Sequence, residues 1–419
     1  MKMIMPIARP AIVKVSQLEG EPMSGRARAI RAATRASGSQ SKRVLGMAVV
    51  RAPPSPQPSP ASGRGSGNGS AGVAPSPLRG EGWGEGDGRT TTIPKSRFDG
   101  FPLALVAALM ALALPLIGSP SSWLTLTMAG LAMGMIIFII ASGLTLVFGL
   151  MDVLNFGHGV FIAFGAFVAT SVFGAMADWT AADSLWRNLA AVFVAMLAAM
   201  ALAAALGWAF ERVLVRPVYG QHLKQILITM GGMIIGEELI KVLWGTAQIP
   251  LPLPEALRGS LLIGDAAVQK FRLVSVAVGL IVLALLLFTL NRTKIGLLVR
   301  AGVQDREMVE SLGYRIRRLF VGVFVAGSAL AGLGGVLWGL HQQNVIPQIG
   351  GQVNVLIFIV IIIGGLGSTL GCLVGALLVG LMTNYIGFAY PVLTSFSSIG
   401  LMVAVLLWRP QGLYPVANR

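Results

Sequence analysis

Three polar residues that can do chemistry stand close together in an otherwise apolar part of the sequence. Asp152, Asn155 and His158 lie within the run GLTLVFGLMDVLNFGHGVFIAFGAFVA, residues 143–169. A carboxylate and an imidazole can exchange protons, and a carboxylate, an amide and an imidazole can each bind a polar solute. A metal site needs three or four ligands brought together, and the other two histidines of the chain are far away in the sequence. The pattern therefore predicts a polar site and favours neither a metal centre nor a catalytic one.

The composition places these residues inside a membrane. Of 419 residues, 55% are hydrophobic and 12% are charged, whereas soluble domains carry roughly 25% charged residues. Residues 101–410 contain repeated apolar runs of about 18 residues or more, the length that spans a hydrocarbon core of roughly 30 Å. The sequence predicts an all-α, polytopic helical membrane protein with about eight to ten transmembrane helices. Its single cysteine, Cys372, excludes an intramolecular disulfide.

Apolar runs separated by polar or glycine-rich breaks define the spans. We place ten of them, at 101–118, 123–150, 156–176, 188–210, 225–244, 271–290, 319–340, 353–366, 368–388 and 393–409. The eighth span is short, and GGLGS at 364–368 separates it from the ninth. The sequence leaves open whether this pair makes two crossings or forms one re-entrant element.

Positive charge is concentrated outside the spans. Residues 1–98 hold 15 of the 32 Lys and Arg residues and only five acids. This segment is rich in Pro, Gly and Ser, which favours a disordered N-terminal extension, or a start site assigned too early, ahead of a transmembrane domain over 99–419. Among the loops, 291–318 holds seven Lys and Arg residues and 211–224 holds three, so the positive-inside rule predicts that both are cytoplasmic. Ten spans then place both termini in the cytoplasm.

The sequence gives no sign of an energy source within the chain. It contains no GxxxxGKS/T phosphate-binding loop and no HExxH zinc motif. The strong acids within the spans are Glu237 and Glu238, and Lys241 follows Glu237 at the spacing that pairs side chains on a helix. We therefore expect a protein that is not an enzyme and has no cofactor. It is either a passive pore or one subunit of a transporter powered by another polypeptide.

Glycines recur at four-residue spacing in several spans, which lets transmembrane helices pack closely. The clearest case is Gly367, Gly371 and Gly375 in GSTLGCLVGALLVG, and Gly130 and Gly134 repeat the spacing. The spacing predicts a helix-packing role for these glycines rather than contact with a ligand.

The predicted cytoplasmic loop contains a short amphipathic segment. Residues from Gln304 to Leu312 favour two to three helical turns, with Val303, Val309 and Leu312 toward one side. Gly313 suits the left-handed stop after a helix. Such a helix fits a groove on a soluble partner, and a solvated loop with a surface helix explains the pattern equally well.

With these motifs in order, the sequence resembles the LivH-type permeases of branched-chain amino acid ABC importers. The stretch around VLNFGHG is similar to one near the start of these permeases, with an Asn-Phe-small-His-Gly core. The resemblance continues through RPVYG (216–220), LITMGGMIIGEELIKVLWG (227–245), TKIGLLVRAGVQDREMVESLGY (293–314), GSALAGLGGVLWG (327–339), GGLGSTLGCLVGALLVGL (364–381) and LWRPQGL (407–413). It covers about residues 123–415 and leaves out the N-terminal tail and the first span.

The resemblance implies a permease subunit in the inner membrane of a bacterium, carrying branched-chain or related hydrophobic amino acids. The implied partners are a second permease subunit of the LivM type, two ATP-binding subunits and an extracytoplasmic solute-binding protein, so that ATP binds to the partners. Similar permeases serve urea and short amides, and a self-sufficient channel or secondary carrier is the alternative from another class. The loop over 293–318 is the implied counterpart of the coupling helix that docks on the ATPase. Its candidate residues are Arg300, Asp305, Arg306, Glu307, Glu310 and Gly313.

Two interpretations of the polar stretch remain. In the first it lines or gates the translocation path, with Asp152, Asn155, Gly157, His158 and Glu237 as the candidate residues. Asn155 and His158 stand three apart, so on a helix they share a face. In the second, Asn155 and His158 cap helix ends and hold the turn. Polar residues at this depth are tolerated only beside headgroups, other protein or water, which both interpretations satisfy.

Overall fold

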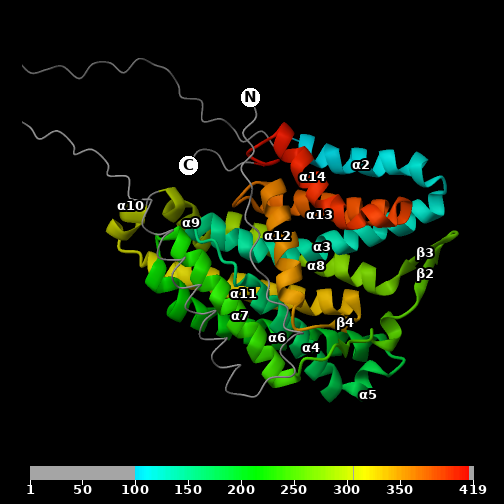
Figure 1. Ribbon diagram of the computed structural model, residues 1–419, viewed down its shortest axis with the longest axis horizontal. Helices are drawn as coiled ribbons and strands as arrows, with labels where there is room; N and C mark the ends of the chain where they lie inside the picture. The colour runs from blue at the N-terminus through cyan, green and yellow to red at the C-terminus, as the bar shows by residue number, and fades with distance from the viewer. Residues whose placement is uncertain (1–99, 305, 415–419) are drawn as a thin grey trace, which may run out of the picture. The chain divides into compact units, whose positions relative to one another are not determined.

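The structure is a computed structural model that describes residues 100–414 apart from 305 (Figure 1). At 300, 303, 304, 306 and 307 it describes the backbone but not the side chains. The predictions for the tail over 1–98 and for Asp305 lie outside the described residues.

Helices occupy all ten predicted spans. They are α2 (Phe101–Ile117), α3 (Pro120–Met151), α4 (His158–Ala175), α6 (Leu185–Phe210), α7 (His222–Trp244), α8 (Lys270–Arg292), α11 (Ile316–Gln342), α12 (Ile349–Gly364), α13 (Thr369–Ala389) and α14 (Thr394–Trp408). Within the described residues, seven helical segments are long and apolar enough to cross a membrane. Of the other three, α2 and α12 have only 17 and 16 residues, and α7 carries several charged side chains. The predicted polytopic helical fold is confirmed.

Short elements occupy opposite ends of the long helices (Figure 1). At one end β2 (Ser260–Ile263) and β3 (Ala266–Gln269) form an antiparallel hairpin, and β1 (Ile249–Pro250) pairs with β4 (Asn344–Val345). At the other end lie α9 (Lys294–Gln304) and α10 (Arg306–Ser311). The remaining elements are the short helix α5 (Ala177–Thr180), the π-helical turn η2 (Glu211–Val215) and the 3₁₀ turns η3 (Arg216–Val218), η4 (Glu255–Leu257) and η5 (Pro391–Leu393).

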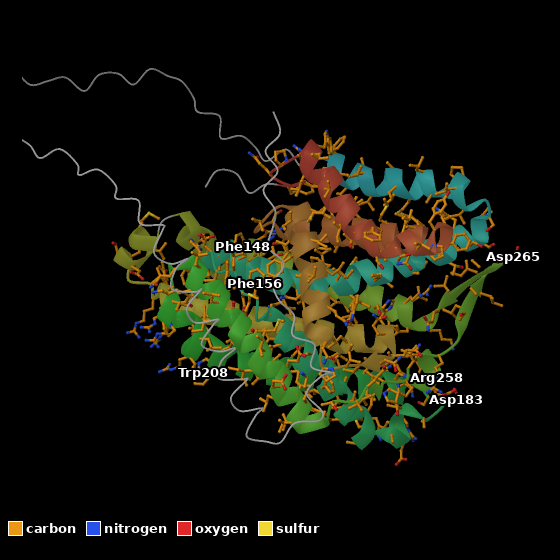
Figure 2. All side chains as sticks on the ribbon, in the orientation of Figure 1. Phe148, Phe156, Asp183, Trp208, Arg258 and Asp265 are labelled. Atoms are coloured by element: carbon orange, nitrogen blue, oxygen red, sulfur yellow. The ribbon has the colours of Figure 1, made fainter. Side chains whose placement is uncertain are left out.

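Alternation of the ten predicted spans places the loops over 177–187 and 245–270 on the side opposite the basic loops 211–224 and 291–318. Figure 2 shows Asp183, Arg258 and Asp265 at that end, away from α10. The loops over 177–187 and 245–270 therefore lie opposite the basic loop that holds α9 and α10. This separation of loops is the one that the spans and their charges predict.

α3 lies at the centre of the core. It packs along α13, α11 and α8, and its residues from Ile136 to Ala141 have no exposed surface. A Cβ added to Gly130 would lie 2.8 Å from Leu381 Cα of α13, and one added to Gly134 would lie 3.0 Å from Leu377 Cα. The two helices touch at this distance because both positions lack a side chain.

Of Gly367, Gly371 and Gly375, only the last two lie within a helix. Gly371 and Gly375 of α13 face the backbone of α12. Gly367 lies in the turn before α13 with a φ of 83°, and its backbone lies against Gly149 of α3. Ser368 caps α13 by accepting a hydrogen bond at Oγ from the N–H of Gly371 at 3.1 Å. The eighth and ninth predicted spans are therefore two separate helices packed against each other.

α3 and α11 each end at a non-glycine residue with a left-handed backbone conformation. After each of these residues the chain turns back into the protein. α3 ends at Asp152 with a φ of 53°, and α11 ends at Gln343 with a φ of 57°. No other non-glycine residue of the described chain has a positive φ. Five non-helical residues follow each ending before α4 and α12 begin. Gly159 and Gly350, the second residues of α4 and α12, touch through their backbones. The N-terminal ends of α4 and α12 therefore meet inside the protein.

Candidate functional site

Asp152 stands apart from the buried residues that follow it in the sequence. Its side chain is 46% exposed, and its Oδ2 lies 4.0 Å from Nε2 of His222 at the start of α7. Asn155 and His158 have no exposed surface. The predicted cluster is thus divided between the end of α3, where Asp152 lies, and the interior.

The contact made by His158 shows the depth at which α4 begins. Its Nε2 lies 3.2 Å from the carbonyl oxygen of Ile140, eleven residues before the end of α3. At 1.5 Å per residue, this carbonyl lies about 16 Å from the end of α3. α4 therefore begins at depth, after a non-helical segment. Because Asn155 lies in that segment and not in a helix, the expectation that Asn155 and His158 share a helix face is wrong.

The non-helical backbone finds hydrogen-bond partners on two other helices, as backbone at membrane depth must. The N–H of Phe156 donates to Thr229 Oγ1 of α7 at 3.2 Å, and the carbonyl of Phe156 accepts from Asn354 Nδ2 of α12 at 2.8 Å. Asn155 Oδ1 accepts from the N–H of Gly157 at 3.0 Å. We call these five residues, Asn155, Phe156, Gly157, Thr229 and Asn354, the polar node. It joins the start of α4 to α7 and α12.

Gly157 fits the polar node because it has no side chain. A Cβ at this position would lie 3.0 Å from the carbonyl oxygen of Thr229 and closer still to the ring of Phe210. The neighbouring Phe156 stacks on Phe358 of α12, with ring centroids 4.6 Å apart. The turn before α4 is therefore held by packing as well as by hydrogen bonds.

Four buried polar atoms in and beside the polar node have no hydrogen-bond partner. They are Asn155 Nδ2, His158 Nδ1, Gln225 Oε1 and Asn354 Oδ1. None of these four residues is more than 5% exposed. An unpaired buried polar atom costs about 1–3 kcal/mol. The region thus has free capacity for hydrogen bonds to water or to a polar solute.

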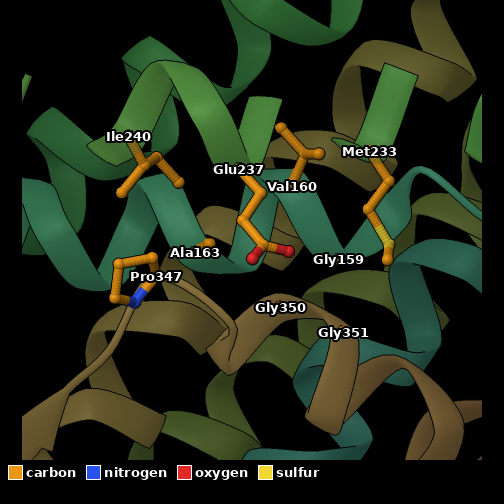
Figure 3. Close-up of a pocket in the computed structure, with 9 residues that line it drawn as sticks. All are labelled: Gly159, Val160, Ala163, Met233, Glu237, Ile240, Pro347, Gly350 and Gly351. Atoms are coloured by element: carbon orange, nitrogen blue, oxygen red, sulfur yellow. The ribbon is translucent and has the colours of Figure 1, made fainter. Parts of the chain in front are cut away.

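Glu237 points into a crevice next to the polar node (Figure 3). The crevice is lined by Gly159, Val160 and Ala163 of α4, by Met233, Glu237 and Ile240 of α7, and by Pro347, Gly350 and Gly351 at the start of α12. Lys241 Nζ lies 3.3 Å from Glu237 Oε1 and 2.7 Å from Glu238 Oε1, which confirms the predicted pairing of Lys241 with Glu237. The carboxylate of Glu237 faces the N-terminal ends of α4 and α12, where the helix dipole concentrates positive partial charge.

The crevice is closed to any solute larger than water in this conformation. The centre of a water-sized molecule has about 10 Å³ of room there, which is close to the least volume that holds one water. Apart from Glu237, the side chains that line the crevice are apolar. An amino acid enters only if α4, α7 and α12 move apart.

α12 exposes polar side chains beside the crevice. Gln348, which caps α12, and Gln352 are both exposed and flank Gly351. Exposed polar groups at this depth are costly in lipid, so this face of α12 suits contact with water or with another protein. Thr229 and Asn354 were not among the predicted site residues, although each is a polar residue within an apolar span, the signal that marks functional positions in membranes.

The end of α10 has the predicted stop. Gly313 has a φ of 84°, and its N–H donates to the Glu310 carbonyl at 2.9 Å. The N–H of Tyr314 donates to the Val309 carbonyl at 3.3 Å, which completes the Schellman pattern. The predicted helix over 304–312 is present as α10, whereas α9 was not expected.

The surface of α9 and α10 carries large apolar side chains that stay exposed among the described residues. Val309 is buried and Leu312 is 67% exposed, so the expectation that they share one side is wrong. Glu310 is exposed, while the side chains of Arg300, Arg306 and Glu307 lie outside the described residues. The exposed large apolar side chains are Ile295, Leu297, Met308, Leu312 and Tyr314.

Comparison with known proteins matches most of the described helices. The family model described as "Branched-chain amino acid transport system / permease component" matches residues 126–406. The high-affinity branched-chain amino acid transport system permease protein LivH of Salmonella typhimurium is 29% identical over 294 residues, which cover 68% of this chain and 92% of LivH. Its counterpart BraD of Pseudomonas aeruginosa is 29% identical over 294 residues, which cover 68% of this chain and 93% of BraD.

Other comparisons are weaker. The permease protein LivM of Escherichia coli is 27% identical over 318 residues, which cover 68% of this chain and 69% of LivM. A solved structure of PsaBC from Streptococcus pneumoniae in complex with Fab aligns over 67% of this chain and 89% of that chain, at a TM-score of 0.34 and 14% identity. That structural likeness is too low to support any inference. The matched region over 126–406 includes the non-helical segments before α4 and before α12, and it includes the crevice. It leaves out α2.

Proposed function

The chain belongs to the family of branched-chain amino acid transport permease components, and from this we propose that it is the membrane-spanning permease subunit of an ATP-binding cassette importer. Its cargo is a branched-chain amino acid or a related hydrophobic amino acid. It works with a second permease of the LivM type, two ATP-binding subunits and an extracytoplasmic solute-binding protein. The chain itself catalyses no reaction and binds no ATP.

The observation that carries the proposal is the carboxylate of Glu237 in the crevice where α4, α7 and α12 meet. Glu237 lies 15 residues from the start of α7 and seven from its end, or about 22 Å and 10 Å along the helix axis. A carboxylate at this depth, with the exposed Gln348 and Gln352 beside it, is costly in lipid. A solute path between this chain and a second permease gives these groups water and protein as neighbours.

The exposed apolar surface of α9 and α10 suits a soluble partner. It lies at one end of the long helices and holds large side chains such as Met308 and Leu312, which are 48% and 67% exposed. Arg315, Arg317 and Arg318 follow directly, so an ATPase groove with apolar walls and acidic margins fits this end. ATP-driven closure of the ATPases then displaces α10 and, through residues 312–315, the long helix α11.

The basic residues of the α9–α10 end give the orientation of the proposed transporter. By the positive-inside rule this end faces the cytoplasm of a bacterium, and the β2–β3 hairpin faces the outside, where the solute-binding protein docks. Both termini are then cytoplasmic, in the inner membrane.

Reconstitution tests the proposal. The chain is purified alone and together with its second permease and two ATPases, and each preparation is placed in liposomes with ATP and the solute-binding protein. We expect ATP-dependent accumulation of labelled leucine by the full complex and none by the single chain. Accumulation by the single chain would establish a self-sufficient carrier instead. Uptake of urea or acetamide without uptake of leucine, isoleucine or valine would replace the proposed cargo.

A further inference from the structure

We propose that the crevice binds the zwitterionic backbone of an amino acid during transport. Glu237 receives the ammonium group, and the N–H groups of Gly350 and Gly351 in the first turn of α12 receive the carboxylate. This inference rests on the proposed function and adds a recognition site within the permease itself. Selectivity then does not reside only in the solute-binding protein.

The arrangement of charges leaves Glu237 available to a cation. Lys241 lies closer to Glu238, at 2.7 Å, than to Glu237, at 3.3 Å. Glu238 is 63% exposed, whereas Glu237 is 23% exposed and points into the crevice. When an ammonium group approaches Glu237, Lys241 keeps Glu238 as its partner. The exchange leaves no lysine unpaired, and Glu237 remains the charged side chain that lines the crevice.

The start of α12 offers the complementary donors. The N–H groups of Ile349 and Gln352 already donate to the carbonyls of Ile346 and Gln348, at 3.0 and 3.2 Å. The N–H groups between them belong to first-turn glycines, which a helix leaves without an intrahelical partner. Neither glycine has a side chain to keep a carboxylate away. Anions bind well at such helix ends because the N–H groups and the dipole act together.

A buried polar atom without a partner lies one helical turn from the glycines at the start of α12. Asn354 is one turn after Gly350 and on the same face of α12. Its Nδ2 donates to the Phe156 carbonyl at the start of α4, and its Oδ1 has no partner although the residue is only 5% exposed. A water or a solute that enters when α4 and α12 separate supplies the missing donor.

The remaining walls select the side chain of the amino acid. Val160, Ala163, Ile240 and Pro347 are aliphatic, so an aliphatic side chain gains contact area and a charged one loses hydration without a partner. The crevice must widen before any amino acid fits. The site therefore forms only in a state in which α4 and α12 have separated.

Protection of an engineered cysteine tests the inference. In the full complex, Cys372 is replaced by alanine and Met233 by cysteine, which places the reactive thiol in the crevice wall. The complex is held in nanodiscs without the solute-binding protein, and the rate of maleimide alkylation is measured with and without ATP. We expect leucine to slow alkylation at least threefold in one nucleotide state. Leucine methyl ester lacks the carboxylate and 4-methylpentanoate lacks the ammonium group, and neither protects at the same concentration.

The matched variants are Glu237→Gln and Glu238→Gln, which each remove one partner of Lys241. We expect leucine protection to disappear in Glu237→Gln and to persist in Glu238→Gln. Equal protection in both variants, or protection by 4-methylpentanoate equal to that by leucine, would overturn the site. If Glu237→Gln does not assemble, the three ligands on the unmodified Glu237 complex still decide the question. A complex that accumulates leucine but shows no protection refutes this inference alone, whereas a complex that accumulates none refutes the proposed function.

Discussion

Alanine in place of Gly350 is expected to force the N-terminal ends of α4 and α12 apart. Its Cβ would lie 2.7 Å from the carbonyl carbon of Gly159 and 3.3 Å from the Cβ of Ala163. Carbon atoms settle at about 3.5–4.0 Å, so the two backbones must separate by roughly 0.8–1.3 Å. The obstacle is backbone, which cannot rotate out of the way as a side chain would.

The size of the effect follows from two opposing contributions. Overpacking of this kind costs about 1–3 kcal/mol. Replacing glycine by alanine in a helix returns at most about 0.5–1 kcal/mol. The net loss in the free energy of unfolding is therefore about 0–2.5 kcal/mol, with a midpoint of about 1 kcal/mol. Gly351→Ala is the matched control, because its Cβ would meet only the flexible end of Met233, at 3.5 Å.

The assay is the melting temperature of the purified permease in one detergent. We expect Gly350→Ala to melt about 2–4 °C below the unmodified protein and Gly351→Ala to melt at the same temperature or slightly above it. A second pair repeats the comparison in α4, with Gly159→Ala against Gly174→Ala, whose added Cβ meets nothing within 4 Å. If Gly350→Ala is as stable as Gly351→Ala, then α4 and α12 do not touch as described. The crevice described beside the contact of α4 and α12 would then also be refuted.

Three further substitutions test other parts of the structure. Thr229→Val leaves the buried N–H of Phe156 without its acceptor and is expected to cost about 1–3 kcal/mol in chemical unfolding, whereas Thr170→Val, which removes a bond only within its own helix, costs less. Gly313→Ala strains the left-handed stop of α10 by about 1–2 kcal/mol, and we expect fewer ATPase subunits to copurify with this variant. Gly302→Ala in α9 is the control, and we expect it to leave copurification unchanged. If both variants copurify the same amount of ATPase, α10 is not part of the coupling surface. Asn188→Ala removes three hydrogen bonds that join α6 to the loops at the hairpin end, so limited proteolysis there should quicken relative to Asn384→Ala.

The spans were predictable because a membrane crossing needs only a long apolar run, which is a local property of the sequence. The predicted span over 225–244 differs from α7 by three residues at one end. The Schellman stop at Gly313 was predictable for the same reason, since the left-handed conformation of a glycine is local. The positions at which the chain turns back into the protein could not be predicted from the sequence. Asp152 looks like an ordinary polar loop residue, and only the contact of His158 with Ile140 shows that α4 starts at depth.

The polar node was hidden from the sequence for a different reason. Phe156 bonds to Thr229 and Asn354, which stand 73 and 198 positions away. Each is a single polar residue within an apolar helix, and the sequence does not specify which neighbouring group its side chain contacts. Tertiary packing alone decides which backbone group it meets. A sequence argument can mark such residues as unusual, but it cannot join them into one site.

The helices on the two sides of the crevice have different neighbours, which bears on how it opens. α4 packs mainly against α11 and α6, whereas α12 packs to a similar extent against α13 and α4 and makes no comparable contact with α11. A displacement of α10 reaches α11 through four connecting residues, 312–315, and so acts on α4 before it acts on α12. Within the first turns of α4 and α12, Gly159 and Gly350 present bare backbone to each other, and the side-chain contacts between the two helices are those of Phe156 in the preceding turn. Because interlocked side chains resist sliding and two smooth backbones do not, we expect the proposed transport cycle to open the crevice by relative movement at this contact.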